Sequence, residues 1–213
     1  MGTIRKGALG GFSGKAGSVV GSSWRDINYI KGLPKLSNKP KSEKQLEQQA
    51  RFAMALRTLL PVKDYLNVGF NDLKQGRRTG FNVALQAFLE KAITGIYPAL
   101  DIDYAMIEFA RGSISFPADV LVTPEAGKLV VDWNTQALKA KADMEDQFTV
   151  LVYEPNSNDY VVGPPLTLRT TGTVDVVMPS DWAGLTVHVY AYFINKNGKD
   201  VSKSIYAGTA IVM

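Results

Sequence analysis

Few side chains in this sequence have the chemistry of a catalytic or metal-binding site. The 213 residues include one histidine and no cysteine, which excludes disulfides, thiolate zinc sites, iron–sulfur clusters, cysteine nucleophiles and multi-histidine metal sites. His188 lies in mid-strand in a β-rich run without a serine or carboxylate close by in sequence, so we expect a surface or cross-strand histidine and not a general base. We therefore expect no catalytic residue, no metal and no cofactor, in a protein that is not an enzyme.

The acidic clusters and one glycine–lysine pair also lack the spacing of a ligand site. Asp101 with Asp103, and the carboxylates between residues 143 and 146, lack the glycine-punctuated oxygen spacing of a calcium loop. We interpret both clusters as solvated loop charge. Gly14-Lys15 is followed by Ala16 instead of serine or threonine, and no apolar strand precedes it, so this pair is not a phosphate-binding loop.

Charge is divided unevenly along the chain. Residues 1 to 100 hold 16 Lys or Arg and 6 Asp or Glu, a net charge of +10, whereas residues 101 to 213 hold 8 and 14, a net charge of −6. Such a dipolar chain favours either an N-terminal half that meets a polyanion or head-to-tail association between copies. A solvated basic arm without a partner is the remaining interpretation.

The first 21 residues hold seven of the 19 glycines and are typical of an arm outside the core. Five of these glycines would form one stripe on a helix, but each interior glycine costs a helix about 1 kcal/mol relative to alanine. We therefore expect the free arm to be irregular or extended. It becomes ordered by packing on a neighbouring copy or on its own domain, or it stays a flexible tail. The candidate assembly residues are Ile4, Gly7, Gly10, Phe12, Gly14, Gly17, Val19, Val20, Gly21 and Trp24.

The basic half also supplies candidate contacts to a polyanion. The β-branched and aromatic segment from 18 to 30 predicts one strand or a bent pair, and a lysine-rich connector follows it. Aromatic and basic side chains there could stack on bases and neutralise phosphates, although a core strand needs no ligand. The candidate residues are Arg5, Lys6, Lys15, Arg25, Lys31, Lys35, Arg77 and Arg78.

Two or three helices are predicted next. The first begins at a capping box, residues 42 to 45, and its apolar spacing carries it to about Leu60. A second helix after the following proline reaches Phe70. A further helix is predicted from Phe81 to Thr94, with Gly95 as its C-cap.

Beyond these helices the pattern changes to short β-rich runs about ten residues apart, which favours an antiparallel sandwich. In the run 185 to 194 the alternation predicts one core face and one half-polar face, and Asn197-Gly198 predicts a turn into the last strand. The runs are 104–109, 114–116, 120–123, 129–133, 148–153, 166–170, 173–178, 185–194 and 204–212.

These patterns together predict an α+β fold. It comprises a glycine-rich basic arm and connector at residues 1–41, a helical section at 42–98, and an antiparallel β-sandwich of the immunoglobulin or fibronectin kind at 99–213. The sequence shows neither an apolar window of about 18 residues nor the apolar region of a signal peptide. We therefore expect no transmembrane segment and synthesis in the cytoplasm, with later residence in an extracellular or virion particle left open.

Several segments together resemble a bacterial family of about this length that is classed as a domain of unknown function. The resemblance spans essentially the whole chain and implies a full-length unit without a signal peptide. It brings no catalytic or binding residues, because none is established for that family. The segments that carry it are 10–21 with Trp24, 45–52, 81–84, 92–98, 102–104, 187–190 and 202–208.

The sequence favours a non-enzymatic structural protein that assembles with copies of itself, as in a virion, a phage-tail-like particle or a filament. Apolar residues of the arm would insert into a neighbour's groove or sheet edge, and basic residues would pair with acidic surface. One alternative is a nucleic-acid-associated protein whose residues 5 to 57 neutralise phosphates. A weaker alternative is a carbohydrate-binding sandwich that uses exposed Trp182, Tyr190 and Tyr192.

Overall fold

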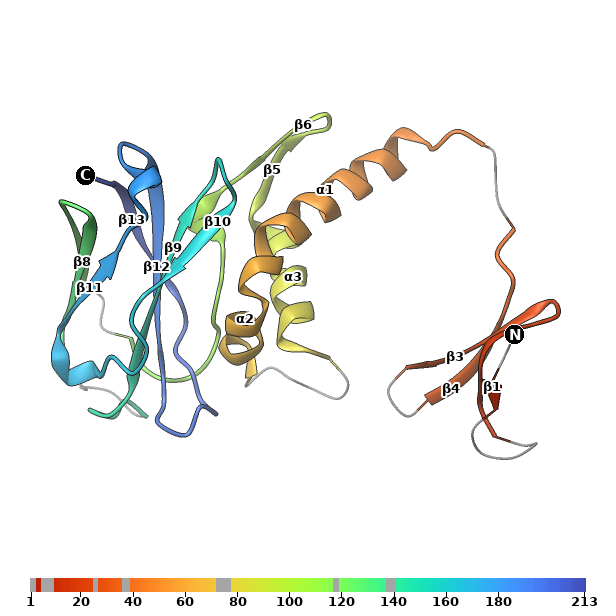
Figure 1. Ribbon diagram of the computed structural model, residues 1–213, viewed down its shortest axis with the longest axis horizontal. Coiled ribbons are helices and arrows are strands. Elements are labelled where there is room, and N and C mark those ends of the chain that lie inside the picture. Colours follow the sequence, from red (N-terminus) through yellow and green to blue (C-terminus); the bar gives the residue numbers. More distant parts are fainter. Residues whose placement is uncertain are drawn as a thin grey trace. The chain divides into compact units, whose positions relative to one another are not determined.

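The computed structural model divides the chain into two compact units, Met1–Ser42 and Glu43–Met213 (Figure 1). It describes residues 3–4, 10–24, 27–35, 39–71, 78–116, 119–136 and 141–213, with residues 3 and 4 described by their backbone alone. Helices and antiparallel sheets occupy separate stretches of the second unit, so the fold belongs to the α+β class.

The first unit is a four-stranded antiparallel sheet, the N-terminal sheet, in which strands adjacent in sequence are adjacent in space. The segment predicted as one strand or a bent pair forms two strands, in agreement with its β-branched and aromatic composition. The glycine-rich segment before it contributes the first two strands and is extended there. The strands are β1 (Thr3–Ile4), β2 (Phe12–Ala16), β3 (Val19–Trp24) and β4 (Ile27–Gly32).

At two positions of this sheet the backbone geometry requires glycine, and neither requirement is that of a glycine stripe on a helix. Gly17 has a φ of +58° in the turn between β2 and β3, a conformation that favours glycine. A Cβ atom at Gly21 would lie 2.2 Å from the carbonyl oxygen of Phe12, within a space that the Phe12 ring also borders. Glycine at position 21 therefore permits the close approach of β2 to β3.

The second unit begins with the helical layer. Its first helix starts directly after Ser42, as the capping box predicts, and the second helix follows the predicted break at Pro61. Thr79 caps the third helix, because its side chain accepts a hydrogen bond from the backbone N–H of Asn82. The layer consists of α1 (Glu43–Leu59), η1 (Leu60–Val62), α2 (Lys63–Gly69) and α3 (Gly80–Lys91).

The third helix ends earlier than its sequence predicts. Residues that follow Lys91 form a hairpin of β5 (Ile93–Ile96) and β6 (Ala99–Ile102), which the sequence analysis missed. Gly95 lies within β5 with a φ of +81°, so its predicted role as a helix C-cap is wrong. A Cβ at this position would lie 2.3 Å from the carbonyl oxygen of Ala99, so glycine suits the hairpin geometry.

Two further antiparallel sheets complete the second unit. One has the strand order β10-β9-β12-β13 and the other the order β11-β8-β7. Three short 3₁₀-helices lie between strands, at Tyr104–Met106 (η3), Arg169–Thr171 (η4) and Ser180–Trp182 (η5). The strands are β7 (Val120–Glu125), β8 (Lys128–Trp133), β9 (Gln147–Glu154), β10 (Asp159–Val162), β11 (Thr173–Val177), β12 (Thr186–Ile194) and β13 (Ile205–Ile211).

In the second unit, the four-stranded sheet β10-β9-β12-β13 lies between the three-stranded sheet and the helical layer (Figure 1). On β12, Val187, Val189, Ala191 and Phe193 belong to the core between the two sheets, in agreement with the predicted core face. The opposite face was expected to be half polar, yet its tyrosines, 190 and 192, are fully buried against the helices. The expectation was wrong because the helical section covers this face.

Three of the predicted strands do not form. Residues 104–109 begin with η3, which is capped by the Asp103 carboxylate accepting from the Ala105 N–H. Residues 166–170 contain the start of η4, and Leu166 has a φ of +61° that interrupts an extended run. Residues 114–116 contribute only an isolated bridge, between Ile114 and Ser202. No helix in the described ranges combines the length and apolar character needed to span a membrane.

Candidate functional site

One face of the N-terminal sheet combines aromatic and basic side chains, and we call it the aromatic–basic face. Directly opposed residues share a face of a sheet, and along each strand every second residue belongs to that face. The register places Val20 opposite both Lys15 and Lys31, Ser22 opposite Tyr29, and Trp24 opposite Ile27. The face is thus formed by Lys15, Val20, Ser22, Trp24, Ile27, Tyr29 and Lys31.

The described residues of the N-terminal sheet form no hydrophobic core of their own. Gly21 is the single buried residue among those described between residues 10 and 42. All six residues of β4 are exposed, with 46% of Ile27, 43% of Tyr29 and 64% of Ile30 accessible to solvent. A sheet with apolar side chains exposed on both faces is typical of an element that is completed by another surface.

The N-terminal sheet also borders a hollow of about 330 Å³, lined mainly by residues of its opposite face. The register places Val19, Gly21 and Ile30 on this side, together with Gly14. Gly11 approaches Asn28 so closely that a Cβ atom there would lie 2.2 Å from the Asn28 side chain. The hollow is lined by Gly10, Gly11, Phe12, Asn28, Tyr29 and Ile30.

The residues predicted for assembly and polyanion contact are only partly brought together. Lys15, Val20, Trp24 and Lys31 share the aromatic–basic face, whereas Phe12, Gly14, Val19 and Gly21 belong with the opposite side, and Gly17 lies in the turn. Ile4 lies in β1, and Gly10 borders the hollow.

The remaining predicted residues do not join that face. Lys35 is exposed in the connector after β4, and Arg78 is exposed in the second unit just before α3. Arg5, Lys6, Gly7, Arg25 and Arg77 lie outside the described residues. Among the described residues, two of the predicted polyanion contacts, Lys15 and Lys31, share one face.

A second surface, which the sequence analysis did not identify, is the outer face of the three-stranded sheet, here the outer acidic face. Two of its apolar residues are strongly exposed, with 63% of Leu121 and 74% of Val177 accessible to solvent. The sequence signal that could have located it is the alternation of polar Thr173 and Asp175 with Val174 and Val176 along β11. It is formed by Leu121, Thr123, Glu125, Lys128, Val130, Asp132, Thr173, Asp175 and Val177.

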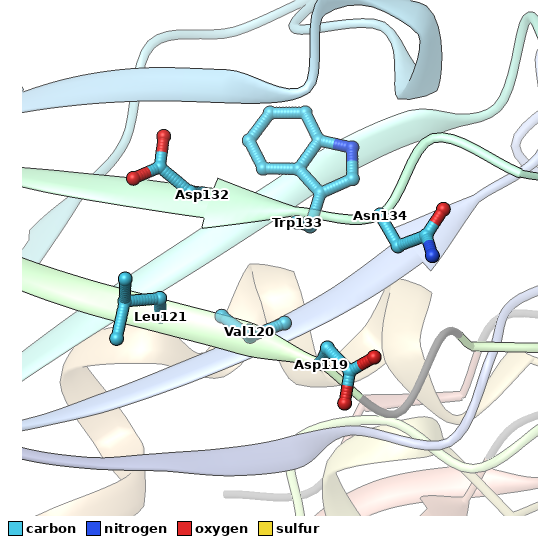
Figure 2. A pocket seen from close by; sticks show the side chains of 6 residues that line it. All are labelled: Asp119, Val120, Leu121, Asp132, Trp133 and Asn134. Atoms are coloured by element: carbon cyan, nitrogen blue, oxygen red, sulfur yellow. The ribbon is translucent and has the colours of Figure 1, made fainter.

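The charges of the outer acidic face differ between its two ends. At one end Lys128 pairs with Asp175 at 2.7 Å and with Glu125 at 3.1 Å, and these hydrogen bonds raise the pKa of the lysine. At the other end Asp119 and Asp132 border a hollow of about 460 Å³ beside Leu121 (Figure 2). Within the described ranges neither of these two carboxylates makes an ion pair, so the described residues leave this end of the face negatively charged.

Arg169 and Asp146 form a buried ion pair that joins segments of the second unit. Arg169 donates to Asp146 at 3.1 Å, to the carbonyls of Asp143 and Ser115, and lies 3.7 Å from the centroid of the Phe193 ring. Both charged side chains are 1% exposed, so the expectation that Asp146 is a solvated loop charge was wrong. The described residues contain no group of three or more potential metal ligands among His, Cys, Asp and Glu.

His188 lies on β12, on the face of its sheet that is turned toward the helical layer. Its Nδ1 is 2.8 Å from the Tyr206 hydroxyl on the neighbouring strand, and its ring stacks on Tyr104 with centroids 4.0 Å apart. The prediction of a cross-strand histidine is confirmed, but the residue is only 9% exposed and so is not a surface group. Burial lowers the pKa of His188, because the charged form loses its hydration.

The aromatic residues expected to form a carbohydrate surface are inaccessible. Trp182 is 4% exposed, and Tyr190 and Tyr192 are fully buried. The Tyr190 hydroxyl donates to the carbonyl oxygen of Tyr104 within the helical core. The expectation that these three side chains are exposed was wrong, because two lie under the helical layer and Trp182 lies in the core between the sheets.

Comparison with known proteins supports the resemblance seen in the sequence. The profile of a family of unknown function, DUF6266, matches residues 11–208. The match covers nearly the whole chain, so the protein belongs to this family. No curated protein matches the sequence.

Proposed function

We propose that this member of a family of unknown function is a non-enzymatic structural subunit that assembles with copies of itself, as in a virion, a phage-tail-like particle or a filament. The observation that carries the proposal is the exposure of the N-terminal sheet, in which Gly21 is the single buried residue among those described from 10 to 42. The apolar side chains of the N-terminal sheet become buried by contact with a second molecule.

The energetics favour such a contact. A small sheet without a hydrophobic core is marginal in water, since at least one face must be covered for independent stability. Complete burial of a large apolar side chain contributes about 1.5–3 kcal/mol. Ile27, Tyr29 and Ile30 all retain more than two fifths of their surface in contact with solvent, so covering them supplies a substantial driving force.

The edge of the sheet offers a second mode of contact. β4 stands at the end of the strand order, and none of the described strands pairs with its outer side. Unpaired backbone groups on an edge strand are a template for strand addition by another chain. Exposed edges of the two sheets in the second unit would contribute to the same assembly.

The charges of the two units are complementary. Residues 1–42 hold 8 Lys or Arg and 1 Asp or Glu, a net charge of +7, and residues 43–213 hold 16 and 19, a net charge of −3. Opposite net charges favour contact between the first unit of one copy and the second unit of another. This arrangement is heterologous, so it propagates as a ring or an open polymer.

Deletion of residues 2–42 tests the proposal. The full chain and the deleted chain are compared by light scattering over a range of concentrations, with circular dichroism as the control for folding of the remaining unit. We expect the full chain to increase in mass with concentration and the deleted chain to stay monomeric. An unchanged oligomeric state after the deletion would overturn the proposal.

We further propose that the two sheets of the second unit form an immunoglobulin- or fibronectin-like sandwich. The first, second and fifth of its described strands, β7, β8 and β11, share one sheet, and the other four share the second. This order departs from the immunoglobulin constant arrangement only in the sheet that the fourth strand joins. A shared core rich in valine and aromatic residues between the sheets supports the same interpretation.

A nucleic-acid-associated role is the second candidate, favoured by the grouping of Lys15 and Lys31 with Tyr29 on one sheet face. Aromatic rings can stack on bases while lysines neutralise phosphates. Such binding weakens by about one log unit of affinity per log unit of salt for each phosphate contacted. A mobility-shift assay at about 50 mM salt tests it, and absence of a shift contradicts it.

A further inference from the structure

We infer that the aromatic–basic face of one copy docks on the outer acidic face of a second copy. This inference rests on the proposed function and adds the identity of the receiving surface. It names a docking site on the three-stranded sheet, at the strands β11, β8 and β7. The occupant is the N-terminal sheet of another molecule of the same chain.

The receiving surface has exposed apolar residues that the described part of the second unit does not cover. The inner side of its sheet contributes Leu129, Val131 and Val176 to the core between the two sheets, so that side is occupied. On the outer side Leu121 and Val177 are 63% and 74% exposed, and no described residue of the second unit forms a layer over them. Burying these side chains requires contact with another surface.

The strand register gives this surface an ordered pattern. Across the three strands, one row consists of Thr173, Asp132 and Leu121, and the next of Asp175, Val130 and Thr123. Apolar and acidic side chains thus alternate over the face. On the aromatic–basic face the two lysines flank Val20, and Tyr29 lies two residues before Lys31 on the same strand.

The charges of the two faces are opposite. Strands β2 to β4 contain two lysines, Lys15 and Lys31, and no acidic residue. The outer acidic face holds three carboxylates and one lysine, a net charge of −2, and Asp119 at the bordering hollow adds a further negative charge (Figure 2). A polyanion would be repelled by the outer acidic face, whereas a second copy offers it both lysines and apolar rings.

The dimensions of the two faces also agree. Each presents three strands of five or six residues, namely β2, β3 and β4 on one side and β7, β8 and β11 on the other. At about 3.3 Å per residue a six-residue strand is about 20 Å long. Faces of equal length can pack as layers about 10 Å apart, as in a sandwich of two sheets.

The test exchanges the charges of the two faces in full-length protein. One variant carries Lys15→Glu and Lys31→Glu, and the other carries Asp119→Lys and Asp132→Lys. Each variant alone would oppose like charges, so we expect its association constant, from sedimentation at about 50 mM salt, to fall about tenfold or more. In an equimolar mixture, each contact between one variant and the other again pairs opposite charges. We expect the mixture to regain association near that of the unchanged protein.

A matched control carries Asp64→Lys and Asp159→Lys, two exposed carboxylates of the second unit away from the outer acidic face. Its net charge changes by the same amount as that of the variant with Asp119→Lys and Asp132→Lys, and it should associate like the unchanged protein. If the unchanged protein is monomeric throughout, the proposed function itself fails. Another result would be that the variant with Lys15→Glu and Lys31→Glu loses association while the variant with Asp119→Lys and Asp132→Lys associates like this control. That result, or a mixture of the two variants that regains no association, would show that the receiving surface is wrongly assigned, and the proposed function would stand.

Discussion

Lys31 on β4 is the direct cross-strand partner of Val20 on β3. The pair places a positive charge beside an apolar side chain on the same face of the N-terminal sheet, and Lys15 on β2 repeats this relationship on the other side of Val20. A face with this composition matches an acidic surface that also exposes leucine and valine. The outer acidic face of the second unit has both properties.

The first prediction separates the two faces of the N-terminal sheet. The double variant Ile27→Ser with Tyr29→Ser removes apolar surface from the aromatic–basic face, and we expect it to weaken self-association at least tenfold. Ile30→Ser removes a still more exposed apolar residue from the opposite face and should have a smaller effect. Sedimentation equilibrium measures both. A larger loss for Ile30→Ser would show that the docking face is the other one.

The second prediction concerns the close approach of β2 to β3. Gly21→Ala places a Cβ 2.2 Å from the Phe12 carbonyl oxygen, so the two strands must separate. We expect faster amide hydrogen exchange in residues 12–24 and weaker association. Gly32→Ala is the matched control, because a Cβ at Gly32 meets no atom within 4 Å. Equal exchange rates in the two variants would contradict the packing described for Gly21.

The third prediction concerns the buried ion pair of the second unit. Arg169→Leu leaves the Asp146 carboxylate buried without its cation, and we expect the free energy of unfolding to fall by about 3–5 kcal/mol. Arg111→Leu breaks a more exposed pair with Glu108, so it should cost about 1 kcal/mol or less. Urea denaturation followed by fluorescence measures both. Similar losses for the two variants would argue against a special role for the buried pair.

The fourth prediction follows from the lowered pKa of His188. Because the folded protein binds this proton less readily than the unfolded chain, stability due to neutral His188 is present above the unfolded-state value of about 6.5. It is lost as pH falls below that value toward the lower folded-state pKa. We expect the free energy of unfolding to decrease between about pH 7 and pH 5.5. His188→Gln should flatten this dependence, and an unchanged slope in the variant would contradict the assignment.

Much of the fold was predictable because local pattern and final environment agree. Ser42 and the apolar spacing after it located the first helix, and the alternation around Val189 located the core face of β12. The same alternation could not show that Tyr190 is buried, because its burial depends on helices α1 to α3, which lie far earlier in the chain. Long-range packing therefore decided the environment of residues whose local pattern looked amphipathic.

The candidate surfaces show the same limit. Basic and apolar residues near the N-terminus pointed to an interaction region, but their grouping on one face depends on the cross-strand register of Lys15, Val20 and Lys31. Arg169 and Asp146 are 23 residues apart, and the intervening segment gave no local signal of their pairing. A charged residue in a β-rich run looks solvent-facing until its partner is known.

The most direct test of the account detects contact between copies at the N-terminal sheet. The chain has no cysteine, so Ser22→Cys on the aromatic–basic face gives a single site for a photoactivatable cross-linker. Copies labelled with ¹⁵N and unlabelled copies are mixed, irradiated and digested for mass spectrometry. We expect cross-linked peptides that join a labelled to an unlabelled copy. Cross-links confined to peptides of the same label would contradict it.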